Sequence, residues 1–293
     1  MRLSTIKTIL RNHCNNWIDS VLDKQVQDLA KRNTIITGGA ITSMLLNEKV
    51  NDFDVYFRDI ETATAVAEYY VNLYNGTTKK LRGVKGIPEV QLKTITNIKN
   101  EDETRVTIFI KSSGVVGEMK VEQTPELISE VAAVKEKFRP IFFSNNAISL
   151  TSKTQLVIRF FGEPSEIHKN YDFVHATSVY DYRYDQLDIP KEVYESIITK
   201  RLIYNGSLYP VASLFRLRKF IKRGWSVSAG QILKIAHQIS AIDLTDIEVL
   251  REQLIGVDQS HMQTLIGVLE SRDPKQRIDN IYITTLLDEI FED

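Results

Sequence analysis

The chain has 293 residues, with 37 basic and 38 acidic side chains, so its formal charge is −1. Hydrophobic residues make up 43% of the chain, which suits a packed core, and the length allows one large domain or two ordinary ones. The balanced charge excludes a polybasic binder that depends on its overall field, although a local basic face can still bind phosphates. Cys14 is the single cysteine, which excludes an internal disulfide and a cysteine-rich zinc site.

Hydropathy argues against membrane insertion. No run approaches the ~18 apolar residues of a membrane-spanning helix. The N-terminal segment starts basic but lacks the continuous apolar core and small-residue cleavage site of a signal peptide. We therefore expect a soluble, cytoplasmic protein with no membrane partner, whose oligomeric state the sequence does not indicate.

The first two thirds of the chain mix helical and strand patterns. Apolar spacing near 3.6 residues predicts helices, and β-rich or alternating runs predict strands. In chain order we expect helices over 5–31, a strand over 34–37, a helix over 40–46, a strand over 52–57, a helix over 60–74, loops and short strands over 75–105, a strand over 104–112 and a helix over 125–137. Then follow strands over 141–143, 147–150 and 155–161, a turn at 162–164, a short helix over 165–170 and a strand over 172–180.

From about residue 188 the pattern is helical almost to the C-terminus. The change predicts an α+β fold, in which a mixed α/β part precedes an all-helical part. We assign an N-terminal helical segment to residues 1–30, a mixed domain to 31–187 and a helical domain to 188–293.

The segment with the most chemical information joins a Gly-Gly pair to two aspartates. Gly38-Gly39 stands between the predicted strand and helix, where backbone N–H groups can approach a phosphate. Asp52 and Asp54 lie two residues apart on the next predicted strand, so both carboxylates face the same side. Neighbouring oxygen ligands beside a phosphate site favour Mg²⁺ over zinc.

The order of strand, Gly-Gly, helix and Asp-x-Asp strand over residues 34–58 resembles the signature of the DNA polymerase β-like nucleotidyltransferase superfamily. Within it, GGAITSMLL and NDFDVYF look most like the head of CCA-adding enzymes and bacterial poly(A) polymerases. The chain departs from that group at Thr42-Ser43, where the family usually has Arg-Asp. A looser likeness extends over 141–228, and the nearest overall likeness is to nucleotidyltransferases of large tailed bacteriophages, which implies the host cytoplasm as location.

This resemblance implies a nucleotidyltransferase palm, a mixed β-sheet with flanking helices, followed by the helical domain. It also implies two Mg²⁺ or Mn²⁺ ions, which clamp the reacting groups, and an NTP substrate. Asp52 and Asp54 would hold metal, with Asp172 as third ligand and base, and Glu118 as the alternative third carboxylate. The nucleotide would be bound by Gly38, Gly39, Ser43, Arg216 and Lys219.

Several of these residues also have purely structural interpretations. Asp172 can be a cap or structural carboxylate, and His168 and His175, which flank it, are more often structural than catalytic. The basic run over 216–223, with Arg216, Lys219 and Arg223 on one helix side, can equally be a solvated face.

Two other groups stay open in the same way. The basic residues of the loop over 79–85 can contact RNA or be solvated. Tyr180, Tyr182 and Tyr184 can stack bases or pack along a strand.

The sequence favours a metal-dependent enzyme that moves an NMP from an NTP to a hydroxyl, and an RNA or tRNA 3′ end is the favoured acceptor. One alternative keeps the chemistry but uses a protein, a small molecule or a nucleotide as acceptor. Another is a catalytically silent module with a binding or structural role, against which the intact Asp-x-Asp argues.

Overall fold

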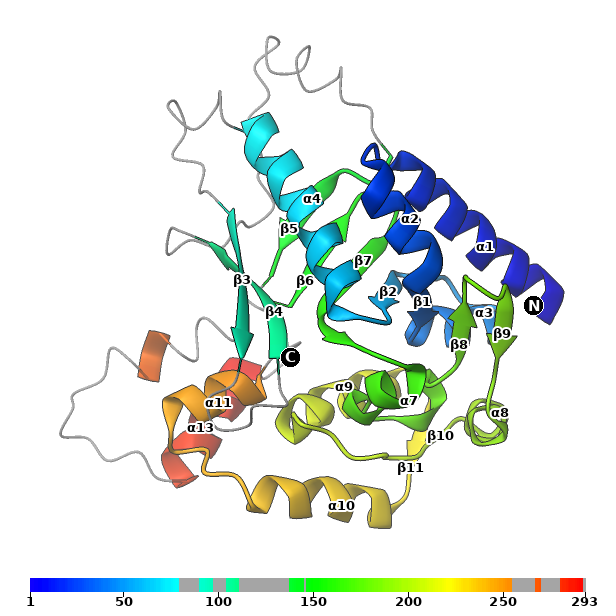
Figure 1. The fold of residues 1–293 in the computed structure, drawn as a ribbon. Coiled ribbons are helices and arrows are strands. Elements are labelled where there is room, and N and C mark those ends of the chain that lie inside the picture. The colour runs from blue at the N-terminus through cyan, green and yellow to red at the C-terminus, as the bar shows by residue number, and fades with distance from the viewer. Residues whose placement is uncertain are drawn as a thin grey trace, which may run out of the picture. The chain divides into compact units, whose positions relative to one another are not determined.

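The fold divides into two compact units in the computed structural model, which describes residues 1–78, 90–96, 104–110, 137–144, 146–254, 267–269 and 280–291. The first unit consists of Met1–His168 and Ala176–Pro190, and the second of Lys169–His175 and Lys191–Asp293 (Figure 1). The short segment Lys169–His175 thus belongs by its contacts to the second unit. The domain limits expected from the sequence stay a prediction.

The first unit is built on a mixed sheet. Among the described residues its seven strands run in the order β5-β6-β7-β2-β1-β8-β9. β2 and β7 are parallel, and every other neighbouring pair is antiparallel. This confirms the predicted α+β fold with a mixed sheet. The strands are β1 (Thr34–Thr37), β2 (Phe53–Phe57), β5 (Pro140–Phe143), β6 (Ala147–Leu150), β7 (Thr154–Phe161), β8 (Val179–Asp181) and β9 (Gln186–Asp188), and a separate antiparallel pair is formed by β3 (Val90–Thr96) and β4 (Thr104–Ile110).

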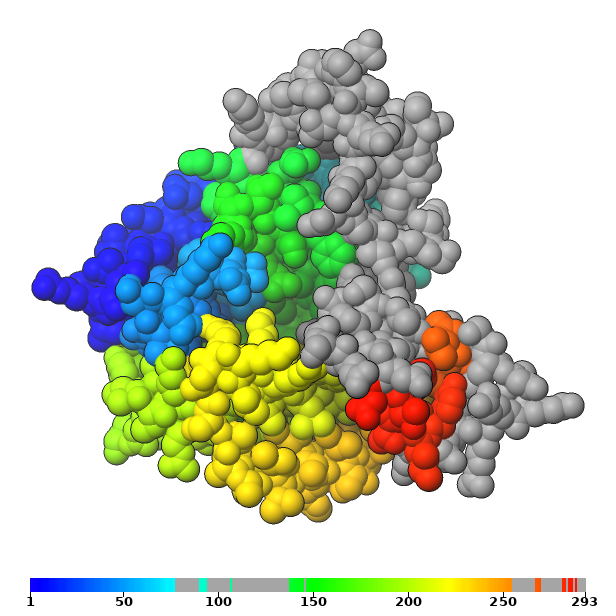
Figure 2. Space-filling model, turned by 180° about the vertical axis from the view of Figure 1, so that it is seen from behind, coloured from blue at the N-terminus to red at the C-terminus, as the bar shows by residue number. Residues whose placement is uncertain are grey.

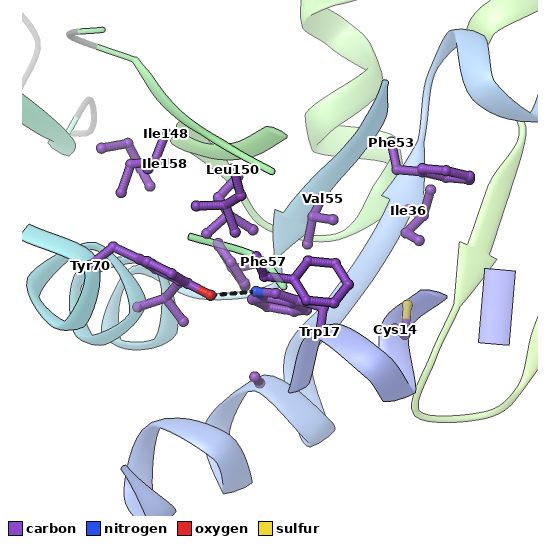
Figure 3. Close-up of a cluster of buried hydrophobic side chains, with 14 of the residues drawn as sticks. Cys14, Trp17, Ile36, Phe53, Val55, Phe57, Tyr70, Ile148, Leu150 and Ile158 are labelled. Atoms are coloured by element: carbon purple, nitrogen blue, oxygen red, sulfur yellow. Dashed lines mark hydrogen bonds between the residues drawn. The ribbon is translucent and has the colours of Figure 1, made fainter. Parts of the chain in front are cut away.

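Helices cover one face of this sheet and form the core with it (Figure 1). They are α1 (Leu3–Ser20), α2 (Lys24–Asn33), α3 (Gly39–Leu45) and α4 (Ile60–Thr78). Trp17 of α1 is fully buried, and its Nε1–H donates to the hydroxyl of Tyr70 on α4 at 2.9 Å (Figure 3). Val55 and Phe57 of β2 are also fully buried in this cluster, so alternate residues of β2 face the helices.

The predicted strand over 172–180 is wrong for most of its length. After the short helix α7 (Pro164–Ile167) the chain forms the 3₁₀ turns η1 (His168–Asn170) and η2 (Val174–Ala176), and only β8 is a strand. Phe173 contributes to the β-rich composition of this segment, but it is buried against aromatic rings. It is 1% exposed and packs on the rings of Tyr204 and Phe220. Tyr182 and Tyr184 fall in the turn after β8, so the three tyrosines do not share a strand.

Among its described residues, the second unit is helical apart from one short parallel strand pair, an isolated bridge between Phe173 and Tyr204 and connecting turns. Its described elements are α8 (Lys191–Thr199), β10 (Arg201–Leu202), α9 (Pro210–Lys222), β11 (Ser226–Val227), α10 (Ala229–Ser240), α11 (Ile247–Gln253) and α13 (Asn280–Phe291). Val211, Leu250 and Leu286 belong to its apolar core. No helix among the described residues is both long and apolar enough to span a membrane.

Several sequence predictions concern residues outside the described ranges. They include the alternative carboxylate Glu118, the basic loop over 79–85, the rest of the predicted loops and strands over 86–89 and 97–103, residues 111–112 of the strand predicted over 104–112, and the predicted helix over 125–137 up to residue 136.

Candidate functional site

The glycine pair lies where β1 ends and α3 begins. Gly38 is buried and has φ 99° and ψ −160°, a conformation that residues with a Cβ avoid. Its N–H donates to the carbonyl of Ala176 at 3.1 Å, which ties the turn to the segment before β8. Gly39 is exposed, and a Cβ added there would meet nothing within 4 Å. Gly38 is therefore required by the backbone, whereas Gly39 leaves open space at the start of α3.

The two aspartates lie at the same end of the sheet as this turn. Asp52 is exposed immediately before β2, and Asp54 is half-buried within it. In the antiparallel pair of β1 and β2, Thr37 lies opposite Asp54, so the Gly-Gly turn that follows Thr37 approaches the level of Asp52. Val55 points toward the core side of the sheet (Figure 3), so Asp54 faces the opposite side.

The electrostatics of Asp54 favour a cation. Burial, and next the charge of Asp52, raise the pKa of Asp54 to about 7. Within the described ranges neither aspartate has a hydrogen-bond or salt-bridge partner in the protein. A partly desolvated carboxylate pair without donors is stabilised by a bound cation, and carboxylate oxygens suit Mg²⁺ or Mn²⁺.

The aspartates do not form a complete metal site by themselves. No group of three or more His, Cys, Asp or Glu side chains placed to hold a metal occurs among the described residues. An ion at Asp52 and Asp54 would need further oxygen donors, which Mg²⁺ commonly takes from water and from substrate phosphates. The chemistry of the pair therefore fits a metal that acts together with a phosphate ligand.

Thr37, which sequence reasoning missed, lies opposite Asp54 and is hydrogen-bonded to His168. The Thr37 hydroxyl donates to the carbonyl of Ser178 at 2.7 Å, so the 2.8 Å contact with His168 assigns the donor to His168 Nε2–H. Burial lowers the pKa of His168 to about 4, which keeps the ring neutral. Its position is that of a structural residue holding Thr37 beside Asp54. No motif marks Thr37, because the link depends on strand register.

Ser43, the other nucleotide-binding candidate of this unit, lies inside α3. It is 9% exposed, and its carbonyl accepts the N–H of Glu48 at 2.7 Å. Nucleotide binding by Ser43 stays a prediction. The segment from Asn47 to Asp52 reaches the surface, in the lighter blue of Figure 2.

Asp172 and Arg216 meet in the second unit. Arg216 Nη1 donates to Asp172 Oδ2 at 2.6 Å, and Asp172 is 9% exposed. The Asp172 carbonyl accepts the N–H of Asn205 at 2.8 Å, so both backbone and side chain are held. The structure thus pairs the predicted third carboxylate with the predicted base-reading arginine. Lys219, one turn further along α9, is exposed, as are Arg218, Lys222 and Arg223.

His175 lies in an aromatic cluster of the second unit. Its ring is 4.5 Å from that of Phe220 and 4.5 Å from that of Trp225, between centroids. Burial, and next the charge of Arg223, lower the pKa of His175 to about 4. These contacts favour the structural interpretation of His175.

The mixed sheet, the Gly-Gly turn and the aspartate pair define an α+β protein with an acidic candidate metal site at one end of its sheet. Comparison with known families then places the chain. The family model described as "Gabija anti-defense 2 family protein" matches residues 8–200, more than half of the chain. The protein belongs to the Gabija anti-defense 2 family.

Individual relatives extend this finding. The chain is 22% identical over 247 residues to the Gabija anti-defense 2 protein of Bacillus phage SPbetaL7, and the match covers 83% of this chain and 46% of that protein. Among solved structures, it is similar to the Bacillus stearothermophilus CCA-adding enzyme in complex with CTP, with 12% identity and a TM-score of 0.37 over 86% of this chain and 51% of the enzyme.

A second solved structure of this kind is the Thermotoga maritima CCA-adding enzyme complexed with tRNA. It is 12% identical, with a TM-score of 0.38, over 94% of this chain and 58% of the enzyme. The chain spans about half the length of these relatives.

Proposed function

We propose that this protein is a divalent-metal-dependent nucleotidyltransferase that serves phage anti-defense in the infected bacterial cell. The observation that carries the proposal is Asp54, a half-buried carboxylate with a raised pKa that lies beside Asp52 at the end of the sheet where the Gly-Gly turn opens. The motif order over residues 34–58, the same segment that builds this geometry, supports the enzyme class.

In the proposed reaction the acceptor hydroxyl oxygen forms a bond to the α-phosphorus of an NTP. The bond from that phosphorus to the pyrophosphate oxygen breaks, pyrophosphate leaves, and the hydroxyl proton passes to a carboxylate. Divalent ions, when bound, supply Lewis-acid stabilisation of the phosphate charge. Asp52 and Asp54 would hold them, and positioning with electrostatic stabilisation would account for most of the rate.

The other predicted residues have proposed roles in the same reaction. Gly39 leaves the backbone open for the triphosphate beside Gly38. Asp172 is proposed as third carboxylate and proton acceptor, and its ion pair with Arg216 would hold its side chain in place. Lys219, exposed on α9, would neutralise phosphate charge.

Two acceptors are candidates, each favoured by a different observation. The likeness of the motif to the head of CCA-adding enzymes favours an RNA or tRNA 3′ end. The family name favours an acceptor within the Gabija defence system itself, either a protein or a nucleotide that the system uses.

One labelling experiment distinguishes the two candidate acceptors and tests the enzyme proposal. The protein is incubated with each α-³²P-labelled NTP, Mg²⁺, total RNA and purified Gabija components, beside an Asp52→Asn/Asp54→Asn variant. Label in RNA supports the first acceptor, and label in a Gabija protein or a small product supports the second. Wild-type protein that labels nothing and binds no NTP would overturn the enzyme proposal and leave a silent binding protein.

The anti-defense role has its own test. Phage are plated on cells that carry Gabija and express either wild-type protein or the double variant. We expect wild-type protein to restore plaques and the double variant to fail. Equal rescue by both would separate anti-defense from catalysis.

A further inference from the structure

The sheet face that carries Asp54 presents a row of polar side chains across four strands. Thr37 of β1 lies opposite Asp54 of β2, and Asp54 is in register with Gln155 of the parallel strand β7. Gln155 in turn lies opposite Ser149 of β6. Residues paired in register point to the same face of a sheet, so these four side chains lie at one level on the face away from the helices.

The next row on the other face has the opposite character. Ile36, Val55, Leu156 and Ile148 occupy the neighbouring register positions, and each is fully buried in the core cluster. Asp54, Gln155 and Ser149 are instead each partly exposed. These three members of the polar row are therefore accessible to solvent, whereas Thr37 is fully buried.

Gln155 is the informative member of this row. Its side chain makes no hydrogen bond to any described residue, and the same holds for Ser149. A partly buried carboxamide that the protein leaves without a partner needs water or a ligand to satisfy its oxygen and its two N–H donors. Thr37 differs, because His168 and the Ser178 carbonyl already engage its hydroxyl.

The spacing brings Gln155 within reach of an ion at Asp54. Neighbouring strands lie about 4.8 Å apart, so a carboxylate and a carboxamide on the same face can meet one cation between them. Carboxamide oxygens are established ligands of hard cations, and they also accept hydrogen bonds from metal-bound water.

We propose that Gln155 is a further residue of the metal site, whose carboxamide oxygen binds the divalent ion at Asp54 or one of that ion's water molecules. This inference rests on the proposed metal binding by Asp52 and Asp54, and it adds a neutral oxygen donor from the parallel strand to their two charges. Because the donor is neutral, a carboxylate in its place strengthens the attraction for a cation.

The test measures Mn²⁺ binding by electron paramagnetic resonance in the absence of nucleotide, so it does not depend on activity. Wild-type protein is compared with Gln155→Leu and Gln155→Glu, and with Gln186→Leu as a matched control, since Gln186 is an exposed glutamine of β9. We expect Gln155→Leu to weaken Mn²⁺ binding about tenfold, as for other residues that support metal ligands. Gln155→Glu tightens it, and Gln186→Leu leaves it unchanged.

The outcomes of this experiment distinguish a failure of the role proposed for Gln155 from a failure of the proposed metal site at Asp52 and Asp54. If Asp54→Asn abolishes Mn²⁺ binding while Gln155→Leu and Gln155→Glu both bind as the wild type does, the role of Gln155 is overturned and the aspartate site stands. If wild-type protein binds no Mn²⁺, both fail. Thermal unfolding of each variant checks the fold, and should Gln155→Leu unfold, Gln155→Glu still decides the matter by the direction of its change.

Discussion

The two faces of the central sheet use the same strands for different purposes. On the helix-covered face, Val55 and Leu156 are fully buried, while Asp54 and Gln155, one residue before each, stand partly exposed on the other face. Strand alternation makes this possible, since successive side chains point in opposite directions. The helix-covered face therefore stabilises the fold by burying apolar side chains. The other face carries polar side chains, Asp54 and Gln155, that make no hydrogen bond to a described residue.

The largest effect is expected at Asp54, where a substitution should reduce activity without reducing stability. We expect Asp54→Asn to lower nucleotidyl transfer at least about 1000-fold, roughly 4 kcal/mol of transition-state stabilisation, because a metal ligand is lost. The unfolding temperature should not fall, since no hydrogen bond of a described residue depends on Asp54. Steady-state kinetics and calorimetry measure both, with Asp188→Asn, an exposed strand aspartate, as control.

Substitutions at neighbouring positions of β7 test whether the two faces of the sheet contribute differently to stability. Leu156→Ala should destabilise the protein by about 2–5 kcal/mol, because it opens a cavity in the core. Gln155→Leu, on the adjacent position, should change the free energy of unfolding by about 0.5 kcal/mol or less. Urea denaturation measures both, and similar losses at the two positions would contradict the assignment of faces.

Acid should weaken both units, because His175 of the second unit, like His168 of the first, has a pKa lowered to about 4 by burial. The pKa of His175 is lowered to about 4 by burial, below its ordinary value of 6.5, so the folded state holds the ring neutral. Below pH 6.5 the unfolded chain binds the proton more readily, and stability falls as pH drops toward 4, by on the order of 2 kcal/mol. Chemical denaturation from pH 7 to 4 should show this loss, and His175→Phe should reduce the slope if the variant folds.

Asp172 provides a carboxylate that, unlike Asp54, already has a partner. Arg216→Met should cost about 1–2 kcal/mol of stability, because it leaves Asp172 without its charged donor. If Asp172 is also the third ligand, Asp172→Asn should weaken Mn²⁺ binding as Asp54→Asn does. Unchanged Mn²⁺ affinity together with lower stability would assign Asp172 to structure alone.

The two glycines of the turn should respond differently to the same substitution. Gly38→Ala should destabilise the protein by about 1–2 kcal/mol, because its positive φ strains a residue with a Cβ. Gly39→Ala should leave stability unchanged, since its Cβ meets nothing, yet it should raise KM for the NTP if phosphate approaches there. Thermal unfolding and kinetics compare the two, and an unchanged KM would remove Gly39 from the nucleotide site.

Local order along the chain was sufficient to predict part of this site. A β-rich run, two glycines, a helix and two aspartates at spacing two are consecutive features, so the strand, the turn and the closeness of Asp52 to Asp54 follow from short-range geometry, although Asp52 lies just before β2. The mixed α+β class followed from the same patterns. The strand expected over 172–180 was wrong before β8, because Phe173 packs on the rings of Tyr204 and Phe220.

Only the tertiary structure decided which distant residues join the site. Gln155 lies a hundred residues beyond Asp54 and comes beside it through the parallel register of β2 and β7, and Thr37 lies opposite Asp54 through pairing with β1. The ion pair of Asp172 and Arg216 likewise joins a turn to a helix of the second unit. The register between strands that are distant in the sequence depends on how the whole sheet buries its apolar face. It therefore cannot be predicted from a local sequence pattern.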